Sequence, residues 1–188
     1  YIHLLTDPVT LKVVQNTLLY IVILVLFNFL LPYVLSFINT FLMKRGKHVY
    51  KALLFSSSLI ALVVGAILFQ WIFNPVSGPV AAVAESFGVT LPAWSKTPGL
   101  VIVIISLVAV YKAFGYNFLI LLSGMNSVPE ELIEAAKLEK ASNRSIFTNI
   151  VMPLTSSTAV YILIMTIVQG LQYVFTPIKV LTQGGPND

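Results

Sequence analysis

Long apolar segments, separated by short polar ones, dominate the pattern of the chain. Four of them reach the roughly 20 residues that an α-helix needs to cross the hydrocarbon core of a bilayer. Their apolar residues are continuous and do not alternate with polar ones, as the strands of a membrane barrel would. We therefore predict an all-α transmembrane bundle with spans at residues 16–42, 52–73, 99–122 and 153–175. Pro32 predicts a kink in the first span, and a neighbouring helix must cover the carbonyl group that this proline frees.

The composition indicates an integral membrane protein. Hydrophobic residues make up 57% of the 188 residues and charged residues only 10%, whereas about a quarter of a soluble domain is charged. The chain has no cysteine, and its two histidines lie far apart in the sequence, so no disulfide or metal site is predicted. The net charge of +4 is typical of a membrane protein with basic cytoplasmic loops, and we predict no nucleic-acid partner.

The distribution of basic residues predicts the orientation of the bundle. The loops at 43–51 and 123–152 lie on the same side and hold four and three basic residues respectively. The other side holds Lys12, Lys96 and Lys179. Cytoplasmic loops carry the excess of lysine and arginine, so we predict that both loops are cytoplasmic and that both ends of the chain are external.

The external connection at residues 74–98 is predicted to contain a helix that lies in the membrane interface. Prolines and glycines surround its short apolar stretch at 79–87, and such residues mark turns. Trp71 and Trp94 fall near the expected membrane boundary, where amphipathic aromatic rings are enriched.

The loop predicted at 123–152 is far more charged than the segments around it. Residues 130–154, EELIEAAKLEKASNRSIFTNIVMPL, contain four of the seven acidic residues of the chain. Ser127 and Glu130 have the spacing of a capping box, in which each side chain accepts a hydrogen bond from the backbone N–H of the other residue. A helix is therefore predicted at about 128–138.

A second short helix is predicted at about 143–151. Ser142 can cap its first turn, and its apolar face consists of Ile146, Phe147, Ile150 and Val151. Apolar residues outside the membrane need a protein partner, because lipid cannot cover them there. On the residues alone, the segment is either such an interface or merely a well-capped loop.

The sequence of this loop resembles the EAA loop of ABC-importer permeases. That pattern reads Glu-Ala-Ala, three residues, Gly, and then about nine residues to Ile-x-Leu-Pro. The residues that match it in place are Glu134, Ala135, Ala136, Phe147, Ile150 and Pro153. Lys140 stands where the family has a glycine for a tight turn, so it must adopt a left-handed backbone conformation or the turn must shift.

Two other stretches resemble the sugar-type permeases of that family, which include maltose and glycerol-3-phosphate permeases. LLTDPVTLKVVQNTLLY at 4–20 is similar to the stretch before a core helix, and FTPIKVLTQGGP at 175–186 is similar to an external turn. The second span departs from the family, because serines at 56–58 stand where a proline is usual. Family members usually have a further helix at each end, so we expect residues 1–188 to be one transmembrane domain of a longer chain.

The resemblance implies a multi-pass permease subunit of an ATP-driven importer in a bacterial or archaeal cytoplasmic membrane. Its partners would be a second permease subunit, two ATP-binding subunits, an external substrate-binding protein and the membrane lipid. The chain would have no catalytic residue, cofactor or metal of its own, because the partners use the ATP, and it contains no Walker motif. The EAA loop would dock on an ATPase subunit, with Glu134 as the charge contact and with Ala135 and Ala136 allowing close packing.

A different interpretation is a secondary transporter or a membrane anchor that uses no ATP. It predicts internal repeats or an ionisable coupling site within the membrane. The sequence has no internal repeat, and Lys112 is the only charged residue in a predicted span. Lys112 could serve an anionic substrate, pair with a partner subunit or extend outward to the interface.

A polar face of the fourth span predicts a substrate path. Its residues recur at i, i+3, i+4 and i+7, and they are Thr166, Gln169, Gly170 and Tyr173. Counted from Glu134, these four residues and Tyr116 of the third span fall at the pocket positions of maltose-type relatives. The same residues could instead join helices through hydrogen bonds.

The groups on this face suit a carbohydrate. Hydroxyl and amide groups can bond sugar hydroxyls, and an aromatic ring can cover the C–H face of a sugar. No carboxylate lies within a span, which disfavours a cation site. We expect an uncharged or weakly charged carbohydrate, an oligosaccharide or a glycerol-phosphate-like polyol.

Overall fold

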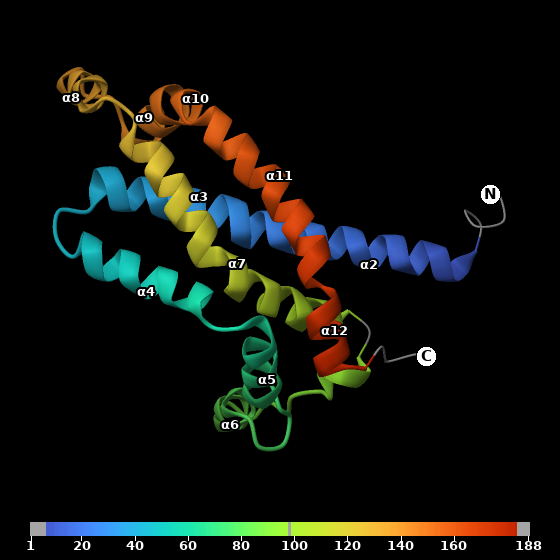
Figure 1. Cartoon of the computed structure of the whole chain (residues 1–188). Coiled ribbons are helices and arrows are strands. Elements are labelled where there is room, and N and C mark those ends of the chain that lie inside the picture. The colour runs from blue at the N-terminus through green and yellow to red at the C-terminus, as the bar shows by residue number, and fades with distance from the viewer. Residues whose placement is uncertain (1–6, 98, 184–188) are drawn as a thin grey trace. The chain divides into compact units, whose positions relative to one another are not determined.

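The computed structural model describes residues 7–97 and 99–183 (Figure 1). Within these residues it contains helices and no strands, so the prediction of an all-α fold is confirmed. Among the described helices, three are long and apolar enough to cross a membrane, and a bent pair makes a fourth if it counts as one span. The chain divides into two compact units. The first comprises residues 1–24, 60–112 and 169–188, and the second comprises residues 25–59 and 113–168.

The first long helix begins earlier than the predicted span at 16–42. It runs without a break from Pro8 to Leu42. Its segments are α2 (Pro8–Val25), the π-helical η1 (Leu26–Leu30), α3 (Leu31–Phe37) and the π-helical η2 (Ile38–Leu42). The Asp7 carboxylate accepts a hydrogen bond from the backbone N–H of Val9 at 3.1 Å, and Pro8 itself has no N–H that would need a partner. This cap explains the early start.

The prediction that a neighbouring helix covers the carbonyl group freed by Pro32 is confirmed. Proline lacks the N–H that would bond the carbonyl of Asn28, four residues earlier. Asn117, from α7 (Leu100–Asn126), donates its Nδ2 to that carbonyl oxygen at 2.8 Å. The same Nδ2 donates to Thr166 Oγ1, on α11 (Ser156–Tyr173), at 3.1 Å. All three side chains are buried, so one amide joins three helical segments of the second unit.

The span predicted at 52–73 is a broken helix. It consists of α4 (Lys47–Leu59) and α5 (Leu62–Ile72), which are bent by 98° at their junction. Ser56 and Ser57 donate their hydroxyls back to carbonyl oxygens of the preceding turn, at 2.7 and 3.1 Å, and such bonds weaken and bend a helix. Ala61 is extended, with φ −61° and ψ 141°. Serines thus lie just before a break in a region where the family resemblance led us to expect a proline.

The last two predicted spans correspond to α7 and to the helical stretch Ser156–Leu181. That stretch contains α11 and α12 (Phe175–Leu181), so it ends six residues beyond the predicted boundary at 175. Pro153 belongs to a separate short helix, α10 (Met152–Leu154). The connection between α5 and α7 contains a helix at the predicted place, α6 (Pro79–Ser86), followed by η3 (Trp94–Lys96). The ring of Trp94 is covered by protein, whereas Trp71 is exposed.

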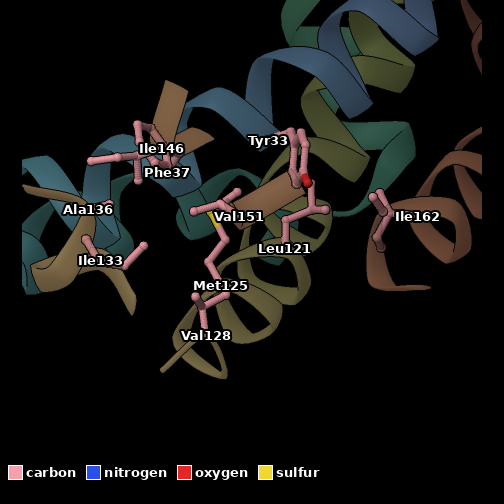
Figure 2. Close-up of a cluster of buried hydrophobic side chains, with 11 residues drawn as sticks. Tyr33, Phe37, Leu121, Met125, Val128, Ile133, Ala136, Ile146, Val151 and Ile162 are labelled. Carbon is pink, nitrogen blue, oxygen red and sulfur yellow. The ribbon is translucent and has the colours of Figure 1, made fainter. Parts of the chain in front are cut away.

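Each unit has its own apolar core. The first unit packs Tyr20, Leu24, Ala66, Trp94, Val101, Ile104, Ile105, Val108, Ala109 and Leu181. The second unit packs Tyr33, Phe37, Leu121, Met125, Val128, Ile133, Ala136, Ile146, Val151, Ala159 and Ile162. This second core takes side chains from α3, α7 and the charged loop together, and so it anchors the loop (Figure 2).

Gly115 of α7 lies directly against the backbone of α4. A Cβ at this position would collide with the carbonyl oxygen of Leu54 and lie 2.8 Å from Phe55 Cα. We expect Gly115→Ala to lower the free energy of unfolding by about 1–3 kcal/mol, because backbone atoms cannot rotate away as side chains can. Thermal unfolding in detergent measures the change.

Gly65→Ala, in α5, is the matched control. A Cβ there would meet Tyr111 Cδ1 at 3.7 Å, which is ordinary contact, and alanine favours the helix by about 1 kcal/mol over glycine. This variant should be as stable as the wild type or more so. Equal stability of the Gly115→Ala and Gly65→Ala proteins would contradict the close approach at Gly115.

Candidate functional site

The first helix of the charged loop is α8 (Glu130–Leu138), and the capping box predicted for it does not form. The residue before the helix is Pro129, and no side chain caps the first turn. Ser127 instead donates its hydroxyl to the carbonyl oxygen of Gly124 at 2.7 Å, because it belongs to the turn that ends α7. The helix therefore begins two residues later than predicted, with Glu130 and Glu131 in its first turn, where the helix dipole favours acidic residues.

Helix α8 has one anchored face and one free face. Ile133 and Ala136 are buried in the core of the second unit. Glu134 and Ala135 are exposed, and Leu138 exposes 84% of its surface. Of the two alanines in the motif, Ala136 therefore packs within the chain, while Ala135 leaves space beside Glu134 for another molecule.

Lys140 adopts the left-handed conformation that the family's glycine would supply, with φ 60°. The turn has not shifted. The N–H of Ala141 donates to the carbonyl of Ala136 at 2.9 Å, and the N–H of Lys140 donates to that of Lys137 at 3.0 Å. These two bonds define a Schellman motif, which ends a helix with a residue in the left-handed conformation. Of the two outcomes predicted for Lys140, the structure has the first.

The second short helix forms as predicted at 143–151, with a change of helix type in the middle. Ser142 Oγ accepts a hydrogen bond from the backbone N–H of Ser145 at 3.2 Å, which confirms the predicted cap. The helix consists of α9 (Asn143–Ile146) and the π-helical η4 (Phe147–Val151). Proline at 153 lacks the N–H that would continue a regular α-helix, and a wider turn precedes it.

The remaining residues of the EAA match divide between the core and the surface. The ring of Phe147 lies against those of Tyr33 and Phe37, with centroids 5.3 and 4.9 Å apart. Ile150 is half-buried beside the same core, and Pro153 is exposed. Figure 2 shows Ile133, Ala136 and Ile146 of the loop gathered near Phe37. The loop is thus a packed part of the second unit.

The predicted substrate-path residues have different surroundings. Within the second unit, Thr166 is buried and bonded to Asn117, while the Tyr116 ring is exposed and its backbone N–H donates to Ser58 Oγ at 3.0 Å. Within the first unit, Gly170 is buried and its carbonyl accepts the hydroxyl of Tyr20 at 2.8 Å.

Gln169 and Tyr173 are half-buried. The structure assigns neither side chain a hydrogen bond within residues 7–97 and 99–183. In this conformation Thr166 and Gly170 thus join helices through hydrogen bonds. This is the alternative to a substrate path that the sequence left open for the polar face. Gln169 and Tyr173 keep their polar groups available.

Lys112 donates its ammonium group to the carbonyl oxygen of Ile60 at 2.9 Å. Ile60 lies in the break between α4 and α5, where carbonyl groups lack helical partners. The sequence could not reveal this contact, since it depends on how α7 packs. Sequence reasoning also missed Asn117, although an asparagine in the middle of an apolar span is a signal for an interhelical contact.

Lys140→Gly is expected to stabilise the protein by about 1 kcal/mol, because glycine adopts a positive φ without the steric cost of a Cβ. Thermal unfolding of the purified protein measures this gain. Lys140→Ala removes the same charge and keeps the Cβ, so it should give no such gain. Equal stability of the two variants would show that charge, and not backbone strain, decides the effect.

Comparison with known families matches residues 35–186 to the family described as binding-protein-dependent transport system inner membrane component. The chain is also 31% identical over 144 residues to the sn-glycerol-3-phosphate transport system permease protein UgpA of Yersinia enterocolitica, covering 76% of this chain and 48% of the relative. UgpA of Pectobacterium atrosepticum is 27% identical over 186 residues, 98% of this chain and 62% of the relative. The chain therefore spans about half to two thirds of the length of these curated relatives.

Solved structures agree on the fold. A bacterial ABC transporter involved in the import of the acidic polysaccharide alginate superposes with a TM-score of 0.83 at 21% identity, over 97% of this chain and 64% of that one. The alginate transporter in complex with an alginate pentasaccharide-bound periplasmic protein gives the same values. The prediction of an ABC-importer permease fold is thus confirmed. The chain belongs to the family of inner-membrane components of binding-protein-dependent transport systems.

Proposed function

We propose that this chain is the membrane-spanning core of a permease subunit in an ATP-driven importer of carbohydrate-type substrates. The main support for the proposal is the loop at 123–152, which has one buried and one exposed face in a member of this family. Its helix α8 is anchored by Ile133 and Ala136 and exposes Glu134 and Ala135. An anchored helix with a free charged face can transmit a movement that a partner imposes on it.

The partner at this face would be an ATP-binding subunit on the cytoplasmic side. The excess of basic residues in the loops at 43–51 and 123–152 supports that orientation. The importer would contain two such subunits, a second permease subunit and an external substrate-binding protein. The alginate transporter, whose structure includes a periplasmic protein, supports the last of these partners. The partner subunits would hydrolyse the ATP, and this chain would supply the path.

The substrate would be a polyhydroxylated molecule. Relatives of the chain are named for sn-glycerol-3-phosphate, and a structural neighbour is named for alginate. The half-buried side chains of Gln169 and Tyr173 offer an amide and an aromatic ring, which suit hydroxyl groups and the C–H face of a sugar. We assign these two residues and Tyr116 to the substrate path. Thr166 and Gly170, also predicted there from the sequence, join helices in this conformation.

The experiment that tests the function is co-purification of the full-length protein with its neighbouring subunits, followed by an ATPase assay. We expect a complex with ATP-binding subunits whose hydrolysis increases when the loaded substrate-binding protein is added. A stable complex without any ATP-binding subunit would contradict the proposal and favour a transporter that uses no ATP.

Glu134→Ala is expected to uncouple hydrolysis from uptake with little loss of assembly. Glu134 is exposed on α8, so its removal leaves the core of the second unit intact, while a charge contact to a partner would be lost. Uptake into proteoliposomes and ATPase stimulation by the binding protein are the measurements. Glu139→Ala, an exposed glutamate just beyond the same helix, is the matched control. Wild-type uptake and stimulation in the Glu134→Ala protein would rule out the coupling role.

Gln169→Ala and Tyr173→Ala should each weaken substrate binding in the membrane several-fold. The loss of one buried hydrogen bond or one ring contact costs about 1 kcal/mol. Uptake of sn-glycerol-3-phosphate and of alginate oligosaccharides as a function of concentration measures the change. Gln172→Ala and Tyr161→Ala delete the same side chains from exposed positions of α11 and should behave as the wild type. If the Gln169→Ala and Tyr173→Ala proteins take up substrate as well as the two control proteins, Gln169 and Tyr173 serve only in packing.

A further inference from the structure

A chain of hydrogen bonds joins α3 to the end of the charged loop. The hydroxyl of Tyr33 lies 2.6 Å from Thr155 Oγ1, and Thr155 Oγ1 donates to the carbonyl oxygen of Val151 at 2.7 Å. A threonine hydroxyl has one proton. Since that proton goes to Val151, Tyr33 must be the donor to Thr155. The bonds thus run in one direction, from Tyr33 through Thr155 to the last residue of η4.

Both partners are buried in a part of the chain where exchange with water is difficult. Tyr33 exposes 3% of its surface and Thr155 exposes 2%. A buried hydroxyl that loses its partner keeps the full cost of desolvation, so breaking the pair is unfavourable. The bond therefore fixes the distance between two segments that lie more than a hundred residues apart in the sequence.

Each end of this connection lies beside a weak point of a helix. A π-helical segment precedes a proline on both sides, with η1 before Pro32 and η4 before Pro153. Pi-helical turns and prolines interrupt the regular ladder of backbone bonds, and helices bend where these interruptions occur. The regular ladder of backbone bonds is thus interrupted just before both Tyr33 and Thr155.

Among the described residues, the other contacts between the loop and α3 are apolar, while Ser36 of α3 donates its hydroxyl to the carbonyl oxygen of Phe118 on α7 at 3.1 Å. Tyr33 and Phe37, one helical turn apart, both contact the ring of Phe147. Figure 2 shows Tyr33 and Val151 among the side chains of the same core. The energy of a contact between two rings changes little when the rings slide past each other. A hydrogen bond, in contrast, weakens steeply as its angle and distance change. The bond from Tyr33 to Thr155 is therefore the directional element of the connection.

We propose that Tyr33 and Thr155 are positioning residues that make α3 follow the charged loop when a partner moves the loop. The proposal rests on the proposed function, since it needs a partner that moves the loop, and it adds the route of that movement into the membrane. Phe147 keeps the loop against α3, and the hydrogen bond prevents α3 from lagging behind. Without the bond, the loop moves and α3 follows it only in part.

The experiment follows the loop and α3 separately with labels attached to cysteine. The 188 residues contain no cysteine, so a single label can be placed in the full-length protein after replacement of any cysteine outside them. Asn143→Cys reports on the loop, and Val34→Cys, on an exposed position next to Tyr33, reports on α3. The spectrum of a spin label is recorded in the assembled transporter, in lipid, before and after addition of ATP with vanadate.

In the otherwise wild-type protein, both labels should respond to ATP. In Tyr33→Phe and in Thr155→Val, the Asn143→Cys label should still respond. The response of the Val34→Cys label should fall about fivefold, the factor by which one lost hydrogen bond shifts a two-state equilibrium. In the double variant, the response of the Val34→Cys label should fall no further than in either single variant, because each single substitution already removes the same bond. Thr155→Ser keeps the hydroxyl and should retain the full response.

Tyr20→Phe is the matched control. Tyr20 also exposes 3% of its surface and donates its hydroxyl to a buried carbonyl, that of Gly170, at 2.8 Å. This variant loses the same chemical group in the first unit, so both labels should respond as in the wild type. An undiminished Val34→Cys response in Tyr33→Phe and Thr155→Val would overturn the proposal. A silent Asn143→Cys label in the wild-type transporter would overturn the proposed function itself.

Discussion

The structure depends on one constraint, which is that a backbone carbonyl group in hydrocarbon must find a donor within the protein. Pro32 removes the N–H that would serve the carbonyl of Asn28, and Asn117 of α7 supplies the missing donor. Because the same amide also bonds Thr166, the donor that serves this one carbonyl group also connects three helical segments. A proline that would weaken an isolated helix thus determines the packing of the second unit.

The same constraint limits which polar residues can serve a substrate. A side chain that already satisfies a helix contact is costly to remove from it, because its partner would be left unpaired. The hydroxyl of Thr166 is held in this way by Asn117, and the backbone carbonyl of Gly170 accepts the hydroxyl of Tyr20. Gln169 and Tyr173 lie on the same face of α11 and are half-buried. The helical spacing therefore groups two residues that join helices with two whose side chains make no hydrogen bond among the described residues, and the second pair is the one that fits the proposed substrate path.

The features that the sequence predicted well are local ones. The apolar runs and the Ser142 cap depend on residues within a few positions of each other. For Lys140 the sequence left two outcomes open, and the structure has the left-handed one. Ser127 shows where local reasoning fails, because two partners lie within reach and the turn at the end of α7 decides between them. The bend at residues 60 and 61 and the partner of Lys112 depend on packing between distant segments, which spacing alone does not determine.

The charged loop shows why a departure from a motif can leave its geometry unchanged. A non-glycine residue in the left-handed conformation costs about 1–2 kcal/mol, and Lys140 bears this cost in an exposed turn. Burial of a side chain such as Ile133 or Ile146 contributes about 1.5–3 kcal/mol, and both are buried in the core of the second unit. The apolar anchors of the two short helices together outweigh the strain of the turn. The position of Glu134 is therefore set by the buried face of α8, and the residue that ends the helix only adjusts how stably that face is held.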